Sequence, residues 1–157
     1  MVDLRFPTAL QLMLSLTLAA REGVLSMSSS ELAEGLAANP SLVRKLIGPL
    51  VQAGLLASSK GKLGGVALAR PPDEITLADV YRAVLPDKKM FFQRTEIPHR
   101  CVVSSNMEPL FADLETELED AVLGSLGART LAGCLVEMEE KGERRGARRR
   151  RAAGKGS

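Results

Sequence analysis

Two short, closely spaced helices with clear start signals occupy the first half of this chain. Ser28 stands three residues before Glu31, which is the spacing of a capping box, although Ser30 could instead cap the same helix alone. Asn39 is a good N-cap for the next helix, and Pro40 suits its first position. Two such helices joined by a tight turn predict a helix-turn-helix.

The second of these helices, over residues 40–53, is predicted to have one apolar and one basic face. Its apolar positions recur with the helical period, at Leu42, Val43, Leu46, Ile47, Leu50 and Val51. The opposite face carries Ser41, Arg44, Lys45 and Gly48. Pro49 removes one backbone N–H and should bend the second half of the helix, which leaves the first half free to enter a groove.

A β-hairpin with a basic tip is predicted to follow this helix. Residues 55–59 and 66–69 indicate two short strands, and the turn between them contains Lys60, Lys62 and Gly64. Helix, helix, turn, helix and hairpin in this order are typical of a winged helix. We therefore predict a mainly α fold, a winged helix-turn-helix with a small β-hairpin wing.

The pattern divides the chain into four parts. Residues 1–85 hold the winged helix-turn-helix. Residues 86–104 show no sustained period and predict a loop that contains Cys101. Residues 105–140 predict a long acidic helix with an apolar stripe and then a last helix, and residues 141–157 predict a basic disordered tail.

Charge is unevenly distributed, although the net charge is only +2. Residues 41–70 hold five basic residues and no acid, whereas residues 107–140 hold nine acids and only Arg129. Residues 141–157 hold eight basic residues and one acid. A basic segment in a nearly neutral chain favours a polyanionic partner, although a solvated surface without a partner would have the same composition.

On a winged helix these basic residues have the chemistry of a contact with double-stranded DNA. Arg44 and Lys45 could reach base edges or phosphates from the major groove. Ser41, near the helix start, could bond a phosphate, and Gly48 would let the backbone approach closely. The alternative is a winged-helix module that binds proteins and shows no preference among duplexes.

Several segments together resemble the Rrf2 family of bacterial winged helix-turn-helix transcription regulators. They are residues 30–34 (SELAE), 39–46 (NPSLVRKL), 53–55 (AGL), 60–70 (KGKLGGVALAR) and 74–84 (EITLADVYRAV). The resemblance covers residues 3–140. It implies a homodimer, with the acidic helix at residues 107–125 crossing to the partner, and a repressor that binds a pseudo-palindrome. Two-fold symmetry would place the recognition helices about 34 Å apart.

The resemblance also implies which residues contact DNA, at the start of the third helix and in the wing. Carried over to this chain, they are Ser41, Leu42, Arg44, Lys45, Lys60 and Lys62, together with Gly64 of the turn. Leu42 comes from the resemblance alone, because the periodicity places it on the buried face.

Cluster-binding members of the family have three cysteines in the loop before the dimerisation helix, whereas this loop holds only Cys101. An iron–sulfur cluster needs about four thiolate-type ligands, so we expect neither a cluster nor another metal cofactor. A dimer would still bring together two copies of Cys101 and of His99, which leaves a two-Cys, two-His site open.

Cys101 has two further interpretations. His99 and Arg100 could lower its thiol pKa and make it a redox sensor. Alternatively it is inert and packs between Ile97 and Val102. The other cysteine, Cys134, lies on an apolar helix face, which favours packing in the core or an interface.

Other classes of protein are disfavoured. No stretch approaches about 18 apolar residues, so we expect no transmembrane helix and no membrane partner. Two distant cysteines favour a reducing cytoplasm. We expect no enzyme, because a Cys101–His99 nucleophile would need an orienting group and an oxyanion site that nothing in the loop indicates. The sequence identifies no small-molecule effector.

Overall fold

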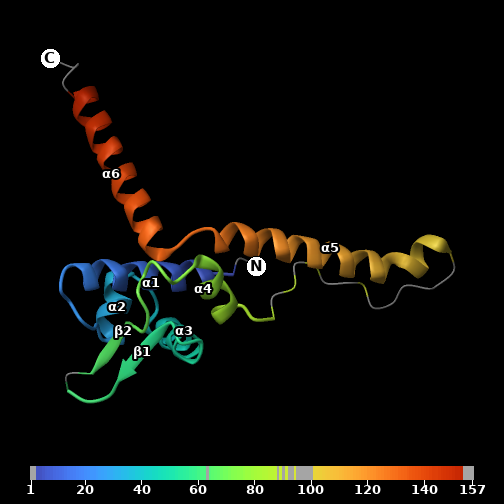
Figure 1. Ribbon diagram of the computed structural model, residues 1–157, viewed down its shortest axis with the longest axis horizontal. Coiled ribbons are helices and arrows are strands. Elements are labelled where there is room, and N and C mark those ends of the chain that lie inside the picture. Colours follow the sequence, from blue (N-terminus) through green and yellow to red (C-terminus); the bar gives the residue numbers. More distant parts are fainter. Residues whose placement is uncertain are drawn as a thin grey trace.

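The computed structural model describes residues 3–62, 64–87, 89, 91, 94 and 101–153, and these residues are mostly helical (Figure 1). Its elements are, in chain order, α1 (Arg5–Arg21), α2 (Ser29–Gly35), α3 (Pro40–Gln52), β1 (Leu56–Ser59), β2 (Gly65–Leu68), α4 (Leu77–Val84), α5 (Val102–Gly127) and α6 (Leu131–Ala153). This order confirms the mainly α winged helix-turn-helix with a two-stranded wing.

The helix-turn-helix begins at the caps that the sequence indicates. The Ser28 hydroxyl accepts from the Glu31 N–H at 3.1 Å, and the Glu31 carboxylate accepts from the Ser28 N–H at 2.7 Å. This reciprocal pair confirms Ser28, rather than Ser30, as the cap of α2. Asn39 Oδ1 accepts from the Ser41 N–H at 2.8 Å and so caps α3, with Pro40 in its first turn.

The hydrophobic core lies where α1 meets α3, α4 and the start of α6. The largest fully buried side chains include Leu12, Met13, Leu50, Ile75 and Leu131. Burying each stabilises the fold by about 1.5–3 kcal/mol. Leu131 reaches the core because its N–H donates to the Ile75 carbonyl at 3.0 Å, so the chain beyond α5 returns to close the domain.

The wing is an antiparallel hairpin in which Leu56 faces Leu68 and Ser59 faces Gly65. It is attached to the segment before α2 as well, by a pairing that the sequence does not indicate. Met27 and Val66 each donate their N–H to the other's carbonyl, at 3.0 and 2.8 Å. This pairing fixes the wing beside the helix-turn-helix.

The long helix α5 begins at Val102, three residues before the start expected from the sequence. Cys101 is its N-cap, because Cys101 Sγ accepts from the Ser104 N–H at 3.5 Å and the Ser104 hydroxyl accepts from the Cys101 N–H at 3.1 Å. Most of the expected loop over residues 86–104 lies outside the described residues, as do Ile97, His99 and Arg100.

The prediction of a disordered tail from residue 141 is wrong for residues 141–153, which continue α6 (Figure 1). Alanine and arginine are good helix formers, and the tail is rich in both. Ion pairs across one helical turn also stabilise this part of the helix. Lys141 Nζ lies 3.6 Å from a carboxylate oxygen of Glu137, and a guanidinium nitrogen of Arg144 lies 3.9 Å from a carboxylate oxygen of Glu140.

Within the described part of the chain, every helix is too short or too polar to cross a membrane.

Candidate nucleic-acid interface

The exposed face of α3 carries the cations that the sequence places there. Val43, Leu46 and Leu50 are buried and hold one side of the helix against the core. Because positions three and four apart share a helix face, Arg44 and Lys45 then point outward, and both are exposed. Ser41 is exposed on the same face, and its side chain stands near the helix N-terminus, which favours negative charge.

Lys60 and Lys62 are exposed at the tip of the wing. The tight turn beside them needs glycine at position 64. A Cβ on Gly64 would lie 2.8 Å from the carbonyl carbon of Lys60 and closer still to the carbonyl oxygen of Ser59, so no side chain fits there. The role of Gly64 is therefore to shape the turn that presents the two lysines.

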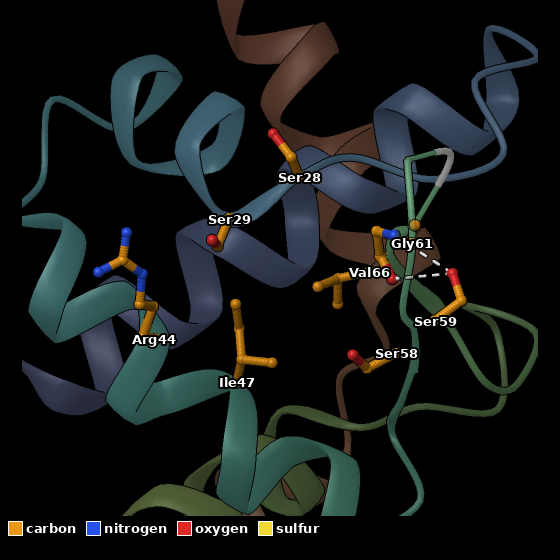
Figure 2. A pocket seen from close by; sticks show the side chains of 10 residues that line it. Ser28, Ser29, Arg44, Ile47, Ser58, Ser59, Gly61 and Val66 are labelled. Atoms are coloured by element: carbon orange, nitrogen blue, oxygen red, sulfur yellow. Dashed lines mark hydrogen bonds between the residues drawn. The ribbon is translucent and has the colours of Figure 1, made fainter.

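A groove of about 340 Å³ separates α3 from the wing (Figure 2). It is lined by Ser28, Ser29, Arg44, Ile47, Ser58, Ser59, Gly61, Gly64, Gly65 and Val66. Arg44 and Ile47 rise from α3 on one side, and Ser58 and Ser59 come from β1 on the other. The lining contains one cation, no acid and four hydroxyl groups, which suits a phosphate or the edge of a polar ligand.

The serines of this groove were missed by reasoning from the sequence. Their signal in the sequence is weak, because Ser58 and Ser59 are only the polar end of an exposed strand and the spacing of Ser28 indicates a cap. Ser59 also has a structural task, because its hydroxyl accepts from the Gly65 N–H at 3.2 Å and ties the wing across the turn.

The predicted contact residues do not all face this groove. It brings together Arg44 and Gly64, whereas Ser41 and Lys45 lie on the exposed face of α3 outside its lining. Leu42 is half-buried and packs against the core, as its periodicity predicts. A role for Leu42 in contacting DNA stays a prediction from the resemblance. We call the five exposed polar positions, Ser41, Arg44, Lys45, Lys60 and Lys62, the α3–wing face.

The two cysteines have opposite environments. Cys101 is exposed, and hydrogen bonds from the Ser104 hydroxyl and N–H, and from the Val103 N–H, hold the pKa of its thiol below the usual value. His99 and Arg100, the expected cause, lie outside the described residues. Cys134 packs against the core, and burial raises the pKa of its thiol.

The fold and this face define a winged helix-turn-helix protein. The family model of Rrf2, described as an iron-dependent transcriptional regulator, matches residues 3–137. The chain therefore belongs to the Rrf2 family of transcriptional regulators.

Two curated relatives from Bacillus subtilis (strain 168) are each named as an HTH-type transcriptional regulator. YwgB is 46% identical over 59 residues, a match that spans only 38% of this chain and 38% of YwgB. YwnA is 28% identical over 104 residues, which span 66% of this chain and 77% of YwnA.

Solved structures extend the similarity over most of the chain. T. potens IscR is 26% identical, with 90% of each chain covered and a TM-score of 0.64. Staphylococcus aureus CymR is 28% identical, with 85% of this chain and 96% of that chain covered and a TM-score of 0.60. A transcriptional regulator from Lactobacillus plantarum, 23% identical with 88% and 91% covered, has a TM-score of 0.73 and shares the fold.

The family description names iron, but within one chain the cysteines do not fit an iron–sulfur cluster. The whole sequence has two cysteines, and Cys134 packs against the core on α6, away from the N-cap of α5 where Cys101 lies. Among the residues that the structure describes, no three His, Cys, Asp or Glu side chains gather as a metal site. One thiolate per chain before α5 falls short of the three or four ligands that a cluster takes.

Proposed function

We propose that this protein is a sequence-specific DNA-binding repressor, with α3 in the major groove and the wing on the backbone or in the minor groove. One observation carries the proposal: α3 and the wing, which both present exposed cations, border the same groove, and its lining holds Arg44 and no acid. Arginine and lysine on a helix face can reach base edges, and the wing lysines suit phosphates. The membership of the chain in a family of transcriptional regulators supports it.

The proposal includes a homodimer held together by α5. This helix of 26 residues has no buried residue, and Leu110 and Leu114 are 52% and 38% exposed. Of the described elements, only α4 packs closely against it. A second copy of the same helix would cover this apolar stripe, and two-fold symmetry would present two α3 helices to a pseudo-palindrome about 34 Å apart.

Cys101 is proposed to modulate DNA binding through its oxidation. Its exposure and lowered thiol pKa support reactivity and disfavour the inert, packed alternative. The thiolate would attack one oxygen of hydrogen peroxide and break the O–O bond, forming a sulfenic acid and releasing hydroxide, which takes a proton from solvent to become water. Because Cys101 caps α5, oxidation there would disturb the start of the proposed dimer helix. If peroxide releases DNA from wild type and from Cys101→Ser alike, this part of the proposal fails.

We further propose that the protein works without an iron–sulfur cluster, without catalysis and in the cytoplasm. The donor set does not fit a cluster, and both cysteines are unpaired, as a reducing compartment favours. Iron and sulfide analysis of protein purified without oxygen tests the first point, and one cluster per dimer would overturn it.

The central experiment compares DNA from upstream of the protein's own gene with a scrambled duplex of equal length. Binding is measured by fluorescence anisotropy at about 0.15 M salt, because salt at this concentration weakens non-specific phosphate contacts. We expect a preference for the native fragment that Arg44→Ala with Lys45→Ala removes while the dimer persists. Arg21→Ala with Arg129→Ala is the matched control, because it removes the same charge from residues paired with glutamates of α6.

Two outcomes would count against this function. Retained sequence preference in the Arg44→Ala, Lys45→Ala variant would refute the role of the α3–wing face. Equal and weak binding of wild type to both duplexes would favour the alternative, a winged-helix module that binds proteins.

A further inference from the structure

The second half of α6 carries a dense group of cations that the proposed function leaves unused. We propose that residues 141–150, which we call the α6 arm, form a second binding surface for duplex DNA, on the side of the molecule away from the α3–wing face. The inference rests on the proposed function, because a second duplex requires a first.

The cations of the arm are gathered on one side of the helix. At 100° per residue, five of its six cations fall within about 140° of the helix surface. They are Lys141, Arg144, Arg145, Arg148 and Arg149. The opposite side carries Gly142, Glu143, Gly146, Ala147 and Arg150. A tail that is merely solvated needs no such segregation, whereas a polyanion that meets one side of a helix does.

Three guanidinium groups on this side are not neutralised. Arg145, Arg148 and Arg149 are exposed, and within the described ranges none of them forms an ion pair, although Lys141 and Arg144 pair with glutamates one turn back. The planar fork of a guanidinium matches two phosphate oxygens, which makes arginine the usual choice for a nucleic-acid backbone.

The direction of α6 places the arm far from the α3–wing face. Leu131 and Leu135 are buried and anchor the first turns, and Arg21 of α1 pairs with Glu139. From there the helix runs away from α3 and the wing (Figure 1). The ten residues of the arm extend the helix by about 15 Å in this direction. A straight duplex that lies on α3 and the wing therefore cannot also meet the arm, which is left to bind a separate duplex.

The acidic helix α5 of a second copy is the other polyanion that could meet the arm. It carries six acids and no cation, at Glu108, Asp113, Glu115, Glu117, Glu119 and Asp120. Exposed carboxylate–arginine pairs contribute only about 0–1 kcal/mol each. A duplex offers a phosphate charge about every 1.7 Å and releases counterions when it binds, so it is the stronger occupant.

The first test measures the arm after the two α3 cations of the α3–wing face have been removed. In an Arg44→Ala, Lys45→Ala background, we expect anisotropy to show continued binding of a random 40-bp duplex. Arg148→Gln in that background should lower the slope of log affinity against log salt by about 0.9, the value for one phosphate contact. Arg150→Gln is the matched control, because it removes the same charge from the opposite side and should leave the slope unchanged. Equal slopes for the two variants would overturn the proposal.

The second test asks whether one protein holds two duplexes. A biotinylated duplex on a surface is loaded with the otherwise unmodified protein, and a labelled second duplex is passed over it. We expect wild type to capture the second duplex, and Arg145→Gln with Arg148→Gln to capture at least tenfold less while still binding the first. Glutamine keeps the helix propensity of the arm. Undiminished capture by the double variant would refute the inference.

The same variants separate the alternative occupant. If polyglutamate displaces the second duplex as well as unlabelled DNA does, or if the double variant loses a salt-sensitive self-association seen without DNA, the arm binds carboxylates and the proposal falls. A failure of the proposed function is distinguishable, because it would show as a lack of sequence preference in wild type while the arm's salt slope stayed intact.

Discussion

Gly48 and Pro49 lie next to each other inside α3, and the glycine has two competing explanations. One is that DNA approaches the backbone closely there. The other is local: a proline disfavours helical φ and ψ in the residue before it, because its ring meets that residue's Cβ. Gly48 has no Cβ, so it can stay helical before Pro49. Apart from its chain neighbours and the backbone of its own helix, nothing lies within 4 Å of a Cβ built on Gly48.

A double-mutant cycle separates the two explanations. In a Pro49→Ala background, Gly48→Ala should stabilise the protein by about 1 kcal/mol, the helix propensity difference. In a protein of this size that raises the midpoint of thermal unfolding by about 2–4 °C. With Pro49 present, the clash should offset this gain, and we expect a coupling of at least about 0.5 kcal/mol between the two sites.

The free energies of unfolding come from urea titrations of all four proteins, with circular dichroism as the signal. Equal stabilisation by Gly48→Ala in both backgrounds would refute the local explanation. The glycine would then need another reason, and loss of affinity for the upstream fragment in the stabilised Gly48→Ala, Pro49→Ala variant would supply it. Unchanged affinity would show that DNA does not touch this part of α3.

Three further predictions concern the wing, the capping pair Thr76 and Asp79 at the start of α4, and the thiol. Gly64→Ala should open the turn, raise hydrogen exchange in the wing and weaken binding to the upstream fragment several-fold, whereas Gly124→Ala, which has open space in α5, should not. Burial raises the pKa of the Asp79 carboxyl, but hydrogen bonds from Thr76 and the charges of Arg70 and Arg82 outweigh it and hold that pKa below its usual range. The ionised Asp79 carboxyl therefore stabilises the folded protein above about pH 3.9, and this stabilisation is lost as the pH falls through the lower pKa of the folded protein. Asp79→Asn should make the free energy of unfolding fall less steeply at acid pH, and an unchanged fall would contradict this. Ser104→Ala should raise the pKa of the Cys101 thiol and slow its alkylation by iodoacetamide at pH 7, with the slowly reacting Cys134 as internal reference, and an unchanged rate would show that Ser104 does not control the thiol.

Much of the winged helix could be predicted because its signals are local. The caps at Ser28 and Asn39 satisfy N–H groups within three residues of themselves, so sequence spacing is sufficient to find them. The pairing of Met27 with Val66 joins residues far apart in the chain and carries no such signal. The start of α5 was missed for another reason, since cysteine is not among the usual N-cap residues.

The candidate site was predictable in its charges and not in its shape. The exposure of Arg44 and Lys45 follows from helical period and the buried stripe opposite them. The serine-lined groove depends on where the wing comes to rest, which the Met27 pairing decides. The prediction of a disordered tail is wrong because composition alone does not decide disorder. Helix propensity and attachment to a helix anchored in the core extend α6 to Ala153.

The basic and acidic segments of the sequence lie on separate surfaces of the folded protein. In the proposed function the α3–wing face would attract a duplex and the acids of α5 would repel one, so the summed field would turn the protein toward DNA before contact. The same repulsion would keep DNA off the apolar stripe of α5 and leave it to a second copy of the chain. The net charge of +2 therefore conceals two basic surfaces and one acidic helix, and we propose a separate partner for each. Replacing Glu117 and Glu119 with glutamine should therefore raise non-specific DNA affinity without improving the preference for the upstream fragment. A parallel gain in preference would contradict the repulsion of DNA by α5.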